Sequence, residues 1–190
     1  MKFFQEGAIA LRHMEPTEQD YAQLYAWLAD ARIAEHYGGL NHRPTLQEVH
    51  EKYAPYILGK EAVVPCIAEY YGSPVGYMQY YPVEEPEYDC RGLVDFSCYA
   101  RPMAVDMLVG EPAQWGRGLG SRLLRALCRY LNEELGADDV FIDPRVNNPR
   151  AIRCYEKAGF ERLVIVPQRE EMDGRKWDNL ILRWQKEERK

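Results

Sequence analysis

The segment AVDMLVGEPAQWGRGLGSRLLRALCRYL (residues 104–131) joins a strand pattern, a glycine-rich loop and a helix pattern in one run. Residues 104–110 are apolar apart from Asp106, which is typical of a buried strand. Three glycines, at positions 116, 118 and 120, alternate just before an amphipathic helix predicted over 118–135. Glycine lets a ligand approach the backbone closely, and the free N–H groups at a helix start hold phosphate oxygens. The segment therefore predicts a phosphate-binding loop.

The glycine spacing does not match two common phosphate loops. The loop lacks the G-K-[ST] ending of a Walker A motif. Its spacing is G-x-G-x-G, whereas the dinucleotide-binding fingerprint is G-x-G-x-x-G. A plain turn with the same glycines has a similar sequence, so the loop alone leaves its ligand open.

The patterns on both sides of this segment predict a mixed α+β domain around one sheet. Helices are expected after Thr17, from Thr45 to about Leu58, and over 148–160, which Pro149 opens and Gly159 closes. The sheet is expected to hold about six to seven strands. The runs that predict these strands are 8–14, 63–70, 75–81, 104–110, 140–143, 163–169 and 176–184. The interval 82–103 shows no sustained period, and such long irregular segments are usually functional or mobile.

Composition limits the partners and the compartment. The formal net charge is −6, whereas a nucleic-acid-binding protein normally has a basic face. No apolar run reaches about 18 residues, and no signal sequence is evident, so we expect a cytoplasmic protein without a membrane partner. Five cysteines and four histidines form no metal-binding spacing, which predicts no metal. The length suits a single domain over residues 1–190.

Two sequence blocks resemble a known family. W-G-R-G-L-G (115–120) resembles the acetyl-CoA pyrophosphate loop of the GCN5-related N-acetyltransferases, although Trp115 stands where that family usually has Gln or Arg. N-N-P-R-A-I-R-C-Y-E-K-A-G-F (147–160) resembles the helix that flanks the CoA thiol in the same family. The resemblance implies the GNAT fold, with a central, mostly antiparallel twisted sheet that splays into a V at the acetyl-CoA site.

Further blocks are similar to aminoglycoside 6′-N-acetyltransferases, and together they extend from about residue 8 to 185. They are W-L-x-D (27–30), E-H-Y-G-G (35–39), R-P-T-L (43–46) and P-V-G-Y-x-Q (74–79). The resemblance implies that acetyl-CoA, as co-substrate, donates its acetyl group to a primary amine of an aminoglycoside antibiotic, which confers resistance. The least matched part is 82–103, where substrate specificity would be expected to vary.

The resemblance also implies the residues that bind acetyl-CoA. The backbone of Met107, Leu108 and Val109 would pair with the pantetheine amides, and one N–H there would polarise the thioester carbonyl. Asn148 matches a CoA-contacting asparagine, but it can equally be a simple N-cap before Pro149. The pyrophosphate would be held by Trp115, Gly116, Arg117, Gly118, Leu119, Gly120 and Ser121.

Two residues are the candidates for catalysis. A carboxylate within the apolar strand 104–110 is costly to bury, so Asp106 is either paired structurally or meets a cationic ligand. By resemblance, Asp106 holds the reacting amine and accepts its proton, directly or through water. Tyr155 matches the tyrosine near the CoA sulfur and is the candidate general acid, while half-buried core is the alternative.

The resemblance places several further side chains around the acceptor. The substrate-binding residues are expected to be Tyr37, Tyr53, Gln79, Asp106, Asp143 and Asp178. Asp143 ends a predicted strand before Pro144, so a turn cap is its main alternative role. Acids at 84, 85, 87, 89 and 95 could add contacts, although most are expected to be solvated. Carboxylates gathered in one cleft would attract a polyammonium substrate.

Two other functions stay open at this stage. A GNAT enzyme of the same fold can act on another amine, such as a polyamine, a siderophore hydroxylamine or a protein amine. A non-catalytic CoA-binding module is a further alternative, but such a module has no need of the proton acceptor Asp106 and the proton donor Tyr155. The oligomeric state is expected to be a monomer or a homodimer.

Overall fold

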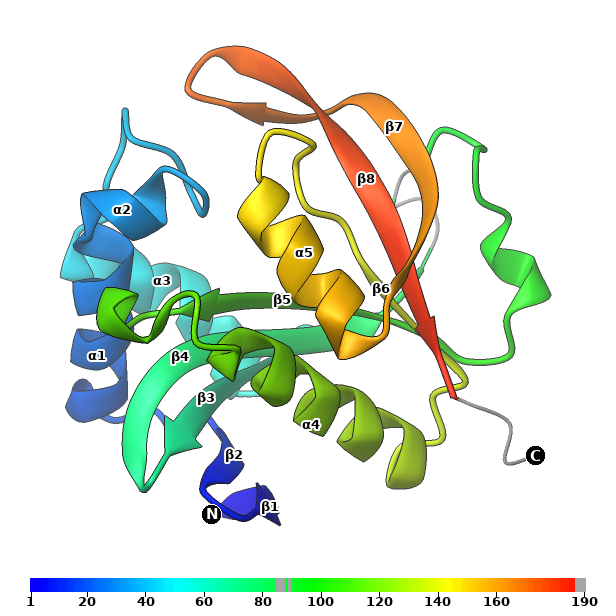
Figure 1. Ribbon diagram of the computed structural model, residues 1–190. Helices are drawn as coiled ribbons and strands as arrows, with labels where there is room; N and C mark the ends of the chain where they lie inside the picture. Colours follow the sequence, from blue (N-terminus) through cyan, green and yellow to red (C-terminus); the bar gives the residue numbers. More distant parts are fainter. Residues whose placement is uncertain (85–87, 89, 187–190) are drawn as a thin grey trace. The chain divides into compact units, whose positions relative to one another are not determined.

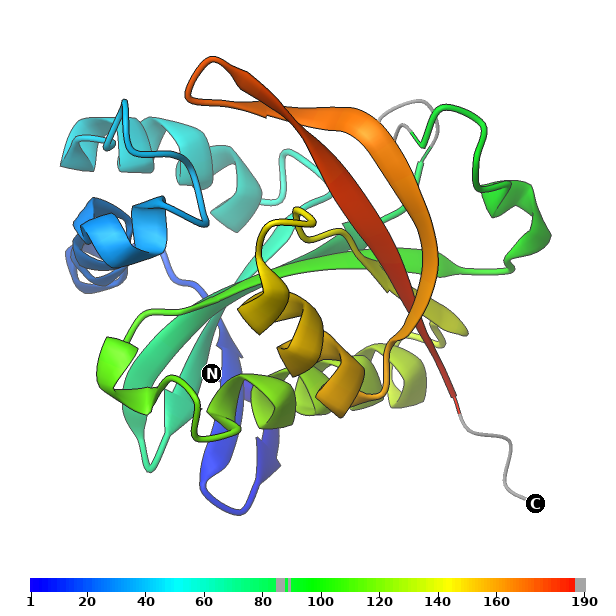
Figure 2. The same cartoon turned by 45° about the horizontal axis from the view of Figure 1, so that its top comes forward.

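A computed structural model describes residues 1–84, 88 and 90–186 of the chain (Figures 1 and 2). Among these residues, eight strands are hydrogen-bonded in the order β1-β2-β3-β4-β5-β6-β8-β7. The chain divides into two compact units: Met1–Tyr80 with Asp106–Gly120, and Tyr81–Val105 with the residues from Ser121 onward. The expected single domain over 1–190 stays a prediction.

The first unit is an antiparallel meander with three helices. Its strands are β1 (Lys2–Glu6), β2 (Ile9–His13), β3 (Val64–Tyr70) and most of β4 (Ser73–Pro82), followed later in the chain by the second half of β5 (Pro102–Val109). Its helices are α1 (Glu18–Ala29), α2 (Ala31–Ala34) and α3 (Leu46–Ile57), and the short 3₁₀ turn η2 is Pro112–Gln114. The core includes Leu24, Trp27, Tyr53, Ile67 and Tyr77.

The predicted helix starts are confirmed. The Thr17 hydroxyl accepts a hydrogen bond from the Asp20 N–H at the start of α1. At the start of α3, Thr45 and Glu48 form a capping box in which each side chain accepts from the other residue's backbone. Caps of this kind satisfy amide groups that the first helical turn leaves without a partner.

The second unit combines the remaining strands with two helices. Its elements are the first half of β5, α4 (Leu119–Glu133, from Ser121 on), β6 (Asp139–Ile142), α5 (Pro149–Ala158), β7 (Glu161–Met172), β8 (Arg175–Gln185) and the 3₁₀ turn η1 (Phe96–Cys98). β5 pairs with β6 in parallel from Pro102 to Ala104, and β8 pairs antiparallel with both β6 and β7. Phe96 and Val94, from the irregular segment 82–103, are buried with Phe141 and Ile181.

The predicted α+β class and the mostly antiparallel sheet are confirmed, but the strand count was too low. The additional strand is β1, whose residues Lys2–Glu6 show no alternation and are largely exposed. Its pairing with β2 depends on the turn at Gly7, which has a positive φ of 56°. A short exposed strand of this kind has no buried face to mark it in the sequence. Among the described helices, none has the length and apolarity needed to cross a membrane.

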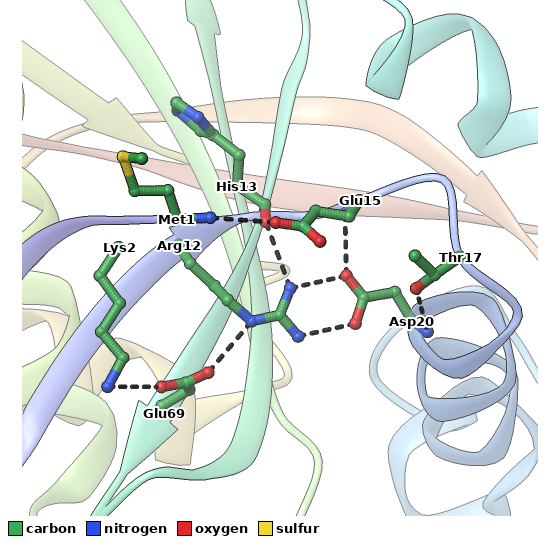
Figure 3. Close-up of polar contacts among 8 residues, drawn as sticks. All are labelled: Met1, Lys2, Arg12, His13, Glu15, Thr17, Asp20 and Glu69. Atoms are coloured by element: carbon green, nitrogen blue, oxygen red, sulfur yellow. Dashed lines mark hydrogen bonds and ion pairs between the residues drawn. The ribbon is translucent and has the colours of Figure 1, made fainter.

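An ion-pair network fixes α1 to the meander (Figure 3). Arg12 on β2 donates to both carboxylate oxygens of Asp20, each at 2.6 Å, and its Nε donates to Glu69 on β3 at 3.0 Å. Lys2 on β1 adds a contact of 3.2 Å to Glu69. The Asp20 side chain is only 5% exposed, and the Arg12 guanidinium lowers the pKa of its carboxyl against the opposing effect of burial. This two-point pairing sets the position of α1, which carries Trp27.

We expect Asp20→Asn to lower the free energy of unfolding at pH 7 by about 2 kcal/mol, because it weakens a charge-assisted, half-buried pair. The folded pKa of Asp20 lies below its unfolded value of 3.8, so this stabilisation is present above pH 3.8 and is lost as pH falls through the folded value. Urea unfolding at pH 7 and pH 3 should show the difference between wild type and variant shrinking at the lower pH. Glu15→Gln, at an exposed pair, is the control. A difference that does not change with pH would contradict this account.

Candidate active site

The Asp106 carboxylate is held by a hydrogen-bond chain from the neighbouring strand. Gln79 on β4 donates its Nε2–H to Asp106 Oδ2 at 2.7 Å, and the Tyr77 hydroxyl donates to Gln79 Oε1 at 2.7 Å. Tyr77 is fully buried, whereas Asp106 is half-buried. Because Tyr77 donates to the amide oxygen, the amide nitrogen of Gln79 has to face the carboxylate. The carboxylate is therefore oriented by a hydrogen-bond donor that carries no charge itself.

Aromatic rings surround this chain. The Tyr53 ring lies edge-on to that of Tyr77, with 5.4 Å between centroids, and edge-on to that of Tyr56 at 5.8 Å. Burial raises the pKa of both Tyr53 and Tyr77, and the Asp106 charge acts in the same direction. Both phenols therefore stay protonated, and the Tyr77 hydroxyl serves as a hydrogen-bond donor to Gln79.

A cavity of about 510 Å³ opens in the same unit. It brings together Tyr37 and Tyr53, whose side chains are hydrogen-bonded to each other. Two carboxylates from α3, those of Glu48 and Glu51, also line it. The complete lining is Leu28, Tyr37, Gly38, Gly39, His42, Pro44, Glu48, Val49, Glu51, Lys52 and Tyr53. Phenol rings and carboxylates in one cavity suit a ligand with hydroxyl and ammonium groups.

The glycine-rich loop is attached to the strand that carries Asp106. The Trp115 indole N–H donates to the Val109 carbonyl at 2.8 Å, so the loop folds back onto the end of β5. Gly116 and Gly118 have φ values of 75° and 78° and lie exposed immediately before α4 begins at Leu119. Gly116 and Gly118 thus leave backbone without a side chain immediately before a helix start, as a phosphate site requires.

Two predicted CoA contacts, Ser121 and Asn148, and the candidate general acid Tyr155 lie in the second unit. The Ser121 hydroxyl donates to the Cys154 carbonyl of α5 at 2.8 Å, so any contact it makes with phosphate would come from its backbone N–H. Asn148 is the N-cap of α5 and accepts from the Ala151 N–H at 3.1 Å. Tyr155 is 8% exposed and contacts Phe160, with 6.4 Å between ring centroids.

The two predicted acceptor carboxylates of the second unit already have internal donors. Asp143 Oδ2 accepts from Arg169 Nε at 3.0 Å. Burial raises the pKa of the Asp143 carboxyl, and the Arg169 guanidinium opposes this shift. Asp178 accepts from the backbone N–H of Gln168 at 2.8 Å. The Asp143 carboxylate thus pairs with a side chain on β7, which differs from the turn cap considered as its alternative role.

Comparison with known proteins identifies the family. The model of the acetyltransferase (GNAT) domain matches residues 16–166, which is most of the chain. The chain belongs to the GNAT acetyltransferase family. The aminoglycoside N(6′)-acetyltransferase type 1 of Klebsiella pneumoniae is 41% identical over 164 residues, covering 82% of this chain and 75% of that protein.

Solved structures agree with this assignment. The enzyme AAC(6′)-Ib in complex with ribostamycin and coenzyme A is 34% identical, with a TM-score of 0.76 over 95% of this chain and 94% of that one. The complex of AAC(6′)-Ib with coenzyme A and kanamycin is 34% identical, with a TM-score of 0.74 over 94% and 95%. A spermidine N-acetyltransferase chimera from Vibrio cholerae and hSSAT, at 18% identity and a TM-score of 0.72 over 94% and 96%, shares the fold alone.

Within this GNAT chain, the structure adds residues that the sequence did not single out. Tyr77 stands two positions before Gln79 on β4, and period-two spacing puts both side chains on one face, so that signal was available. Arg169 carried no such signal, because its contact with Asp143 joins residues that are 26 positions apart in sequence. Among the acids of 82–103, Asp95 caps η1 through the Ser97 N–H and Glu84 is exposed, while residues 85, 87 and 89 lie outside the described residues. Over the described part of the GNAT chain, no group of three or more His, Cys, Asp and Glu could hold a metal.

We expect Tyr77→Phe to lower the free energy of unfolding by about 1–2 kcal/mol, because it removes the buried hydroxyl that donates to the partly buried Gln79 oxygen. Tyr71→Phe, at a ring that is 79% exposed, is the matched control and should change stability little. Urea unfolding at pH 7 measures both variants. Equal stability of Tyr77→Phe and wild type would show that the hydroxyl does not fix the Gln79 amide.

Proposed function

We propose that this GNAT protein is an aminoglycoside 6′-N-acetyltransferase that transfers the acetyl group of acetyl-CoA to a primary amine of the drug. The observation that carries the proposal is the hydrogen bond of 2.7 Å from Gln79 on β4 to Asp106 on β5, the strand that precedes η2 and the glycine-rich loop. An oriented carboxylate and a phosphate-type loop on consecutive segments supply what amine acetylation needs from the protein. The relatives that support the drug as acceptor are the aminoglycoside N(6′)-acetyltransferases.

Acetyl-CoA would be held mainly through the backbone. The N–H groups of Gly116 to Gly120 and the first turn of α4 would bind the pyrophosphate, with Arg117 adding charge at the exposed loop. Met107 and Leu108 would pair with the pantetheine. The Val109 carbonyl already accepts from Trp115, so the contribution of this residue would come from its N–H. Asn148 can act as cofactor contact and as N-cap together, because its amide nitrogen is not used in the cap.

The proton path begins at Asp106. The acceptor arrives as an ammonium ion, and Asp106 would bind it and take its proton, leaving a neutral amine to attack the acetyl carbonyl carbon. As the carbon–sulfur bond breaks, the thiolate of CoA needs a proton, and Tyr155 is the donor that we propose. The result is an N-acetylated drug and free CoA thiol.

The acceptor class follows from the chemistry of the cavity. Tyr37 would pack against a sugar ring with the buried Tyr53 behind it, and Glu48 and Glu51 would attract ammonium groups that do not react. Gln79 would act chiefly through Asp106, since its amide nitrogen is engaged there. Asp143 and Asp178 are the further acceptor contacts that we propose.

The function is tested by thiol release. Purified protein with acetyl-CoA and kanamycin or ribostamycin should release CoA thiol in proportion to drug consumed, detected with a thiol reagent. Spermidine is the comparison acceptor, since it offers amines without sugar rings for Tyr37 and Tyr53. The absence of turnover with any 2-deoxystreptamine drug, or faster turnover with spermidine, would reject the aminoglycoside assignment.

Asp106→Asn should lower kcat with kanamycin by about a hundredfold or more, because the amide cannot accept the ammonium proton. The KM for acetyl-CoA should stay within about twofold of wild type. Steady-state kinetics with varied acetyl-CoA measure both constants. A collapse of acetyl-CoA binding would instead place Asp106 among the cofactor contacts.

Tyr155→Phe is the companion variant for the proton donor. It should slow turnover less than Asp106→Asn, since a CoA thiolate is a better leaving group than an amine and needs less help from an acid. An unchanged kcat in Tyr155→Phe would remove this residue from the mechanism while leaving Asp106 as the base.

A further inference from the structure

An irregularity in the β7–β8 ladder redirects one arginine. Val166 pairs with Asn179 and Glu170 pairs with Trp177, so residues 167–169 of β7 stand against residue 178 alone. Gln168 has a positive φ of 50°, and its N–H is held by the Asp178 carboxylate at 2.8 Å. Bulges change the direction in which a side chain leaves a strand. Here the residue that follows the turn is Arg169.

Arg169 lies against a carboxylate and an aromatic ring. Its Nε is 3.0 Å from Asp143 Oδ2, and its guanidinium carbon is 4.6 Å from the centroid of the Tyr88 ring. The side chains of Arg169 and Asp143 are 14% and 17% exposed, so the pair is shielded but reachable. A carboxylate beside an aromatic face is the combination that binds an ammonium group. Asp143 and Tyr88 therefore form a cation subsite that a guanidinium of this chain fills.

A second carboxylate nearby, that of Glu170, also faces an arginine of this chain. Arg145, with a side chain only 4% exposed, has its Nε 3.8 Å from Glu170 Oε2. Asn179 Nδ2 links the two acids, donating to the Asp143 carbonyl at 2.7 Å and to Glu170 at 3.2 Å. An incoming ammonium group thus meets acids that already face internal cations, and it has to displace one of them.

We propose that Arg169 is a specificity-determining residue: an internal cation that occupies the subsite of Asp143 and Tyr88 and competes there with ammonium groups of the acceptor. The inference rests on the proposed function, in which Asp143 is an acceptor contact. Its consequence is that the wild-type enzyme gains little affinity from Asp143. Removal of the arginine opens the subsite to the drug.

A double-mutant cycle on the KM for kanamycin tests the competition. Arg169→Gln should lower this KM by about fivefold, the effect of one partly shielded ion pair. Asp143→Asn in the presence of Arg169 should change it by less than about twofold, because the guanidinium already occupies the carboxylate. In the Arg169→Gln background, Asp143→Asn should return the KM to the wild-type value. Arg169→Lys keeps a cation and should behave like wild type.

Controls separate specificity from structure. Arg162→Gln removes another β7 arginine, one paired with exposed Glu156, and should leave the KM for kanamycin unchanged. The KM for acetyl-CoA should not change in any variant. A rise in the kanamycin KM in Asp143→Asn alone would overturn the proposal, and this variant decides the matter even if Arg169→Gln does not fold. An unchanged KM for kanamycin in folded Arg169→Gln would also overturn the proposal. If the wild-type protein acetylates no aminoglycoside at all, the proposed function is rejected, and the inference is rejected with it.

Discussion

A carboxylate on an apolar strand needs a hydrogen-bond donor or a cation as its partner. In this protein the Gln79 amide donates a hydrogen bond to Asp106. The pairing holds at 2.7 Å because Tyr77 fixes the amide from its other side. Tyr77 in turn is buried against Tyr53, which packs from α3. The orientation of one carboxylate therefore depends on the packing of a helix on the sheet, and the aromatic core of the first unit is also the support of its chemistry.

The close approach of backbone segments makes this arrangement possible. A Cβ at Gly76 on β4 would overlap the carbonyl oxygen of Leu108 on β5, so a side chain at that position would push the two strands apart. At the end of β5, a Cβ at Gly110 would overlap the ring of Trp27. Trp27 stands on α1, which the pairing of Arg12 with Asp20 fixes. The glycines set the spacing at which Gln79 reaches Asp106, and the ion pair holds the helix that covers the end of the strand.

Local sequence patterns predicted the parts of the structure that depend on neighbours in the chain. The capping box of Thr45 and Glu48, the strand around Asp106 and the glycine-rich loop before α4 all have their causes within a few residues. What the patterns could not supply were pairings between distant segments. The contact of Trp115 with Val109 depends on how the loop folds back, and the contact of Arg169 with Asp143 depends on a bulge that no local motif marks. β1 was missed for the related reason that an exposed strand carries little hydrophobic signal.

The net charge of −6 does not show which carboxylates can attract a cation, because that depends on the hydrogen-bond donor that each carboxylate faces. Asp20 and Asp143 face guanidinium groups, which cancel most of their field. Asp106 faces the amide of Gln79, which orients the carboxylate without neutralising it. A carboxylate that is paired with a guanidinium attracts an ammonium ion less strongly than one that accepts from a neutral amide. The hydrogen bond from Gln79 is therefore compatible with a carboxylate that binds and deprotonates an amine. The neutral donor to Asp106 is the feature that we associate with its proposed catalytic role, whereas the guanidinium of Arg12 pairs with Asp20 to fix a helix.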